Sequence, residues 1–285
     1  MKKSNVILIL IVAMSLPALA YFGGLSSGIQ AVTQAHRMPM VLEVPFMDRD
    51  IDLNKGISVD VWDSIPPAEV EMELQVLAFP WGKGLINPVI VKAFQNGKDI
   101  YFYMSWKDDT ENRNLGLNEL PDAAAIMFPL GEDVQNSTIM MGFMGIVNIW
   151  QWKADSDKEY WLNITQETNA YSDYYYPFEE NETFVVSKHP RMSVHDLNSI
   201  RIGTLTHKPY DIVQGRGFWD KGTWRVVFKR SIKPYDPQFD AVFKPGEKKS
   251  IAFAVWNGAN GDRGSRKSIS HDWTTFEIMP VEGTK

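Results

Sequence analysis

Alternation of apolar and polar residues with a period of two is the sequence feature that most limits the fold of this chain. It is clear over residues 57–61 and 72–76, where every second residue is apolar. Successive side chains of a strand point to opposite faces, so this pattern predicts half-buried antiparallel strands. Further apolar runs, separated by clusters of Gly, Pro, Asp and Asn, predict strands at residues 123–128, 146–152, 183–187, 223–228, 251–256 and 273–278.

A β-hairpin is predicted where residues 89–94 and 100–106 flank the sequence Gln95-Asn96-Gly97-Lys98. Asn-Gly supplies the two positive φ angles of a type I′ turn. Many strands at hairpin spacing, with no long helical period between them, are typical of two packed sheets. We therefore expect an all-β fold, a two-sheet antiparallel β-sandwich with little helix and long loop insertions. Residues 160–192, rich in Tyr and acidic residues, are expected to be such an insertion.

The N-terminus has the parts of an export signal: Lys2 and Lys3, an apolar stretch at residues 6–16, and Ala18-Leu19-Ala20 as a small-x-small cleavage site. We expect a periplasmic or otherwise extracytoplasmic protein. Apolar residues resume at residue 21, so an uncleaved membrane anchor stays open as the alternative. The expected organisation is a signal peptide at 1–20, an N-terminal extension at 21–54 and a sandwich domain at 55–285.

Composition excludes several kinds of chemistry. The 285 residues include no cysteine, which excludes disulfides, thiolate metal sites, iron–sulfur clusters and the covalent C-x-x-C-H haem attachment. A formal net charge of −6 argues against a nucleic-acid partner, since phosphate binding needs a basic face. The sequence has no nucleophile elbow, phosphate loop or dinucleotide fingerprint, which argues against an independent hydrolase or dehydrogenase.

Two segments carry candidate binding residues, and the first is a methionine-rich loop. Residues 139–145 place Met140, Met141 and Met144 among glycines, directly before an apolar strand. A thioether can fill an apolar core, the commoner role, or ligate a haem iron. In the strand that follows, Trp150 and Trp152 share one face, where they would either wall a cofactor pocket or fill the sandwich.

The second segment is a glycine-rich loop that follows a strand ending at Trp256. The loop delivers Arg263, Arg266 and Lys267. A basic turn in solvent is the commoner fate of such a cluster. The close spacing of the glycines instead favours a backbone held near a partner group.

These two segments, together with the hairpin at residues 91–110, resemble the haem b-binding gamma subunits of periplasmic molybdenum oxidoreductases related to dimethyl sulfoxide reductase. Members include ethylbenzene and dimethyl sulfide dehydrogenases, chlorate and selenate reductases and nitrite oxidoreductases. The resemblance spans residues 55–279, and the glycine-rich loop is its most specific part. It implies a β-sandwich that holds one non-covalent haem b between a Met and a Lys ligand.

Carried onto this chain, the resemblance makes Lys267 and Met141 the axial ligands of the haem iron. The loop contains three methionines and is shorter than usual in the family, so Met140 and Met144 remain rivals of Met141. His271 remains the rival of Lys267, because imidazole is the commoner haem ligand and needs no depressed pKa.

The resemblance also implies further contacts and partners. Arg263 and Arg266 are expected to bind the haem propionates, and Trp150 and Asn260 to contact the cofactor. Implied partners are a molybdopterin catalytic alpha subunit, an iron–sulfur beta subunit and a soluble or membrane c-type cytochrome as electron carrier. The chain would then transfer electrons without being an enzyme itself. Two other hypotheses stay open: an exported carbohydrate- or ligand-binding sandwich without a redox role, and a structural subunit without haem.

Overall fold

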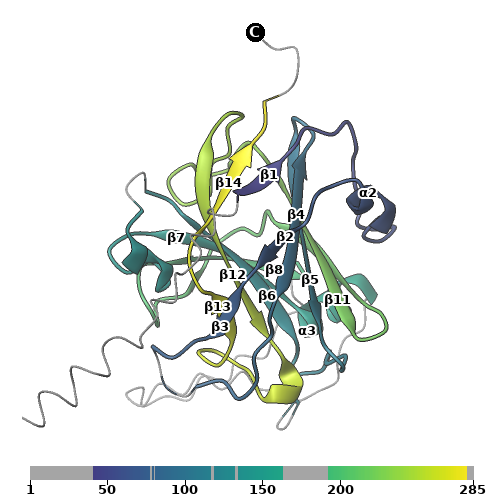
Figure 1. Ribbon diagram of the computed structural model, residues 1–285, viewed down its shortest axis with the longest axis vertical. Coiled ribbons are helices and arrows are strands. Elements are labelled where there is room, and N and C mark those ends of the chain that lie inside the picture. Colours follow the sequence, from purple (N-terminus) through teal and green to yellow (C-terminus); the bar gives the residue numbers. More distant parts are fainter. Residues whose placement is uncertain are drawn as a thin grey trace, which may run out of the picture. The chain divides into compact units, whose positions relative to one another are not determined.

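A computed structural model describes residues 41–77, 79, 81–116, 119–131, 134–162 and 192–280, which form two sheets (Figure 1). The five-stranded sheet has the order β10-β11-β5-β4-β2, all antiparallel. Its strands are β2 (Ala68–Val70), β4 (Val89–Gln95), β5 (Asp99–Lys107), β10 (Gln214–Trp219) and β11 (Thr223–Ser231).

The nine-stranded sheet has the order β1-β14-β12-β6-β7-β8-β9, with β13 paired to β12 and β3 paired to β13. Only β1 and β14 run parallel. Its strands are β1 (Val41–Val44), β3 (Met72–Leu74), β6 (Ala123–Pro129), β7 (Val147–Lys153), β8 (Val194–Ser199), β9 (Thr206–His207), β12 (Lys248–Trp256), β13 (Ser268–Ser270) and β14 (Thr274–Ile278). The predicted all-β sandwich is confirmed.

Aromatic side chains fill the space between the two sheets. Phe102 on β5 packs against Trp150 on β7 with ring centroids 5.9 Å apart, and Trp152 packs on Trp224 at 5.0 Å. Even-numbered residues of β7 face this core, so odd-numbered residues such as Ile149 face the opposite side of the nine-stranded sheet. We call these the inner and outer faces of that sheet.

The predicted hairpin between β4 and β5 is confirmed, with Gln95 paired to Ile100. The predicted turn type is wrong, because Gly97 (φ 83°) has a positive φ whereas Asn96 does not. The Asn96 Oδ1 atom accepts hydrogen bonds from the backbone N–H groups of Lys98 and Asp99 at 3.1 and 2.7 Å. An Asn side chain that bonds its own turn in this way replaces the second left-handed residue.

The strand predicted at residues 57–61 is wrong, because Val59–Asp63 forms the short helix α2. The alternation of apolar and polar residues at 57–61 therefore does not correspond to a half-buried strand. The helix buries Trp62 against Phe94 and Tyr103 of the five-stranded sheet, at centroid distances of 5.3 and 5.1 Å. Burial of one large aromatic side chain therefore outweighs the local pattern.

The sandwich also begins earlier than the expected residue 55. β1 adds to β14, and its Leu42 and Val44 are buried in the core. The predicted strand at 183–187 and the predicted signal at 1–20 lie outside the described residues. Helix α3 (Ala154–Leu162) follows β7 directly and was not predicted. Within the described ranges, no helix combines the length and hydropathy needed to cross a membrane.

Candidate functional site

A cavity of about 420 Å³ lies on the outer face of the nine-stranded sheet, within the size range of small-molecule sites. Its floor comes from alternate residues of β12, β6, β7 and β8: Ala252, Ala254, Ala125, Met127, Ile149, Gln151 and Leu197. Alanines occupy the part contributed by β12 and β6, apart from Met127. Their small side chains leave an apolar floor above which a ligand has room, whereas larger residues would fill the space.

Four loops form the walls of this cavity. The segment after β3 contributes Leu77 and Phe79, and the turn between β8 and β9 contributes Ile202 and Leu205. The loop after β12 contributes Gly264, Ser265 and Lys267, and the methionine loop before β7 contributes Ile139, Met140 and Met141. Most of these side chains are apolar. The cavity therefore suits a large hydrophobic ligand with few polar groups.

Met141 reaches the cavity from a strained turn. It follows the 3₁₀ helix η1 (Asn136–Ile139) and has a φ of 56°, in the left-handed region that residues other than Gly rarely adopt. Its backbone N–H donates to Ile139 O at 2.8 Å. The next residue must be glycine, because a Cβ on Gly142 would stand 2.6 Å from Ser199 O. Such strain costs about 1–3 kcal/mol and is concentrated at binding sites.

Lys267 reaches the cavity from the glycine-rich loop, directly before β13. Its Nζ atom lies 4.8 Å from the centroid of the Trp256 ring. The Trp256 indole N–H donates to Gly264 O at 3.1 Å, which ties the loop to the end of β12. Gln75 holds the other side, because its backbone N–H donates to Lys267 O at 3.1 Å and its side-chain amide donates to Ser265 O at 2.8 Å.

The structure brings Met141 and Lys267 together, with 4.0 Å between Sδ and Nζ. Burial lowers the pKa of Lys267 to about 8, and no carboxylate among the described residues pairs with its ammonium. Thioether sulfur and a neutral amine can both ligate a metal ion, and the structure places one of each on the lining of the same cavity.

The structure separates two of the three rival ligands, Met144 and His271, from this pair. Met140 also lines the cavity, whereas Met144 is 70% exposed and does not. His271 is exposed outside the cavity, and its Nδ1 lies 2.7 Å from Glu73 Oε2. Hydrogen bonding to Glu73 raises the pKa of His271 and favours the imidazolium, which cannot ligate a metal ion. Elsewhere in the described part of the chain, no cluster of His, Asp or Glu is arranged to hold a metal ion.

The other predicted site residues do not line the cavity. Arg263 is exposed, and Arg266 is not among the lining residues although it belongs to the same loop. Asn260 packs against Gly84, where an added Cβ would lie 2.3 Å from its Nδ2. Trp150 faces the inner side of the sheet, where its indole N–H donates to Asn148 Oδ1 at 3.0 Å. Its even position on β7 places it in the core.

Sequence reasoning missed the residues that shape the cavity. We did not predict the alanines of the floor or the role of Gln151. We also did not predict that Trp256 lies next to Lys267. Period two along β7 contains a usable signal, because it places Gln151 on the face opposite the two buried tryptophans. The contribution of Gln75 depends on the pairing of β3 with β13, which local pattern does not predict.

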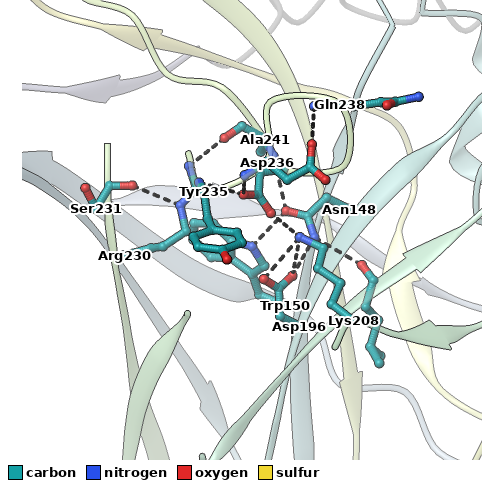
Figure 2. Close-up of polar contacts among 12 residues, drawn as sticks. Asn148, Trp150, Asp196, Lys208, Arg230, Ser231, Tyr235, Asp236, Gln238 and Ala241 are labelled. Carbon is teal, nitrogen blue, oxygen red and sulfur yellow. Dashed lines mark hydrogen bonds and ion pairs between the residues drawn. The ribbon is translucent and has the colours of Figure 1, made fainter. Parts of the chain in front are cut away.

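A buried lysine, Lys208, lies on the inner face among the polar side chains that Figure 2 shows. Its partners differ from those of the partly buried Lys267. Lys208 Nζ is 3.0 Å from Asp196 Oδ1 and also pairs with Asp240. Asn148 Nδ2 donates to Asp196 Oδ1 at 2.7 Å. This lysine is a fully compensated cation whose partners come from β7, β8 and the loop before β12.

A model of the ethylbenzene dehydrogenase family matches residues 59–268. The chain is 26% identical over 223 residues to a protein named as a respiratory nitrate reductase heme subunit from Haloferax mediterranei, which covers 78% of this chain and 67% of that protein. It is 22% identical to the chlorate reductase subunit gamma of Ideonella dechloratans, covering 95% of this chain and 98% of that protein. It is also 22% identical to the dimethylsulfide dehydrogenase subunit gamma of Rhodovulum sulfidophilum, at 77% and 74% coverage.

Among solved structures, the chain is similar to a family 9 carbohydrate-binding module from Caldicellulosiruptor kristjanssonii in complex with glucose. The TM-score is 0.44 at 8% sequence identity, with 86% of this chain and 99% of that chain covered.

Proposed function

Because this chain belongs to the ethylbenzene dehydrogenase family, we propose that it is the haem-carrying gamma subunit of a molybdenum oxidoreductase. It transfers electrons and leaves substrate chemistry to a partner subunit. The observation that carries the proposal is the 4.0 Å approach of Met141 Sδ to Lys267 Nζ across an apolar cavity. Two relatives are themselves named as gamma subunits, of chlorate reductase and of dimethylsulfide dehydrogenase.

The cofactor is one non-covalent haem b. The chain contains no cysteine, so the thioether bonds of a c-type haem cannot form. A single Met–Lys pair lines the cavity in the described residues, which supports a stoichiometry of one. When bound, the haem supplies one-electron chemistry at its iron.

The protein contributes the ligands and the environment of that iron. Met141 offers a soft thioether, which favours the reduced metal and raises the reduction potential. Lys267 must lose its proton to act as a ligand, and its burial already lowers the pKa to about 8. Apolar walls exclude water, which also favours the less charged reduced state. If Met141 and Lys267 both bind the iron, they would leave little room for a substrate at the metal, which fits a role in electron transfer.

The partners follow from the same assignment. We propose an exported complex with a molybdopterin alpha subunit, an iron–sulfur beta subunit and a c-type cytochrome as external carrier. The apolar lining of the cavity disfavours the carbohydrate-binding alternative, because a sugar presents many hydroxyl groups and the cavity offers few partners for them.

The test is reconstitution of the purified chain with haem, followed by optical and magnetic spectroscopy. Wild type should bind one haem in a low-spin form, and acid–acetone extraction should leave a colourless polypeptide. Lys267→Ala and Met141→Ala should each give high-spin or haem-free protein, because one axial ligand is lost. His271→Ala is the matched control and should retain the low-spin spectrum. A low-spin spectrum that survives Lys267→Ala would contradict the proposed ligand pair.

A further inference from the structure

Among the described residues, the polar side chains that line the cavity differ in whether they have hydrogen-bond partners. Ser270 is engaged with the backbone of Phe253, and Gln75 with Ser265 O. Lys267 faces Met141. Gln151, on the floor contributed by β7, makes no hydrogen bond to any described residue. The Gln151 side chain is only partly buried, so its amide is accessible from the cavity and can form hydrogen bonds with a ligand there.

A free cation lies beside Gln151 on the same strand face. Lys153 is two residues further along β7, so its side chain also points to the outer face. It forms no ion pair with any carboxylate in the described ranges. Its charge contributes to lowering the pKa of His195, which pairs with Gln151 across β7 and β8. Lys153 is not among the lining residues, so Gln151 is the polar group of the floor at this end, and Lys153 adds a positive charge beside it on the same strand face.

At the opposite end of the cavity, Lys267 faces Met141 and is the proposed ligand of the iron, so it is not available to an anionic group. Arg263 is exposed and Arg266 does not line the cavity. Toward β13, the floor consists of Ala252 and Ala254, followed by Ile269. The polar groups that accompany an otherwise hydrophobic cofactor therefore have their best partners over β7.

We infer that Gln151, supported by the charge of Lys153, binds a carboxylate of the cofactor and so fixes which edge of it faces β7. This inference rests on the proposed haem function. The amide N–H of Gln151 donates to the carboxylate, and the ammonium of Lys153 balances its charge. Charge-assisted hydrogen bonds of this kind are about twice as strong as neutral ones.

The experiment compares two iron porphyrins that differ only in this group: haem b and its dimethyl ester, in which both carboxylates are methylated. Affinity for each is measured by Soret titration of the apoprotein. Gln151→Leu should weaken haem binding by about 10- to 100-fold, the loss expected for a hydrogen bond to a charged group. The same variant should change the affinity for the ester by less than about threefold, because the ester carries no charge to bind.

Gln151→Glu is the second variant, since it retains size and polarity. It should weaken haem binding at least as much as Gln151→Leu and again spare the ester, because like charges repel. Arg263→Gln and Arg266→Gln are the matched controls and should change neither affinity. Circular dichroism and denaturant unfolding of each apoprotein show whether the fold is retained.

The outcomes separate the two proposals. If wild type binds neither porphyrin in a low-spin form, the haem function itself fails. If wild type binds both but Gln151→Leu and Gln151→Glu weaken both equally, or neither, Gln151 does not bind the carboxylate. A selective loss of haem affinity in Arg263→Gln or Arg266→Gln alone would place the carboxylate at the glycine-rich loop and overturn the inference.

Discussion

The two faces of the nine-stranded sheet treat a buried lysine in opposite ways. On the inner face, Lys208 lies between Asp196 and Asp240, within a network that continues through Asn148 (Figure 2). On the outer face, Lys267 has a thioether and the Trp256 ring as neighbours, and no carboxylate of the described residues pairs with it. The charge of Lys208 is therefore compensated by carboxylates, whereas that of Lys267 is not compensated within the described part of the chain.

This difference teaches how a structural charge can be distinguished from a binding group. A buried ammonium is expensive unless carboxylates compensate it. Lys208 satisfies that condition, so its neighbours explain it fully. Lys267 does not, and burial lowers its pKa to about 8. A group kept at such a cost on the wall of a cavity indicates a ligand that is absent from the polypeptide itself.

Replacement of each lysine by methionine should give the largest difference between the faces. Lys208→Met leaves two buried carboxylates without their cation, so the free energy of unfolding of the apoprotein should decrease by about 3–5 kcal/mol. Lys267→Met removes an uncompensated buried charge and should leave stability unchanged or raise it by about 1 kcal/mol. Urea unfolding at pH 7 measures both. Equal destabilisation by the two variants would show that Lys267 is a structural charge as well.

Ala124 and Ala125 provide the next test, because they are neighbours on β6 that face opposite sides. Ala124 is fully buried in the core, so Ala124→Leu should cost about 1–3 kcal/mol through overpacking. Ala125 faces the cavity, so Ala125→Leu should change apoprotein stability by less than ~1 kcal/mol.

The haem affinities of the same pair complete the test. Ala125→Leu fills the floor and should abolish haem binding, whereas Ala124→Leu should retain it if the variant folds. The measurements are denaturant unfolding and Soret titration. Unchanged haem binding in Ala125→Leu would mean that the cofactor does not lie on this floor.

A smaller effect is expected from His195, a partly buried base on the outer face. Burial lowers its pKa from 6.5 to about 3. The unfolded chain therefore binds the extra proton between these pH values, and stability falls as the pH falls below 6.5. The free energy of unfolding of wild type decreases between pH 7 and pH 5, and in His195→Gln this decrease should be smaller by about 1–2 kcal/mol. Unfolding curves at both pH values measure it.

His271→Gln is the control for that experiment. The pKa of His271 is raised by Glu73, so its contribution has the opposite sign: it is present at low pH and is lost as the pH rises. The same pH dependence of stability in wild type and His195→Gln would show that His195 does not remain neutral in the fold.

Strands were predictable where apolar and polar residues alternate, or where apolar residues form a run, between clusters of turn residues. The hairpin at Gln95-Asn96-Gly97-Lys98 and the strands that became β6, β7, β11, β12 and β14 follow from period two and turn residues. Helix α2 was not predictable, because its position depends on a pocket for Trp62 that the five-stranded sheet supplies. Local alternation carries no information about such a distant partner.

The candidate site was predictable only in part. Residue spacing selected the methionine loop and the glycine-rich loop, and resemblance to the gamma subunits assigned Met141 and Lys267. Trp150 was assigned to the cofactor because nothing local distinguishes a core face from a cavity face. Its neighbours in space, Asn148 and Phe102, place it in the core.

By itself, the sequence determined the all-β class, the central hairpin, the exclusion of every cysteine-based cofactor attachment and the two loops that could bind a cofactor. The tertiary structure alone decided that Lys267, and not His271, faces a methionine. It also decided that alanines of β12 and β6 form part of the cavity floor. Met141 and Lys267 are 126 residues apart and meet within 4.0 Å. Such a meeting depends on strand order and register, which arise from packing of the whole sheet and not from any local pattern.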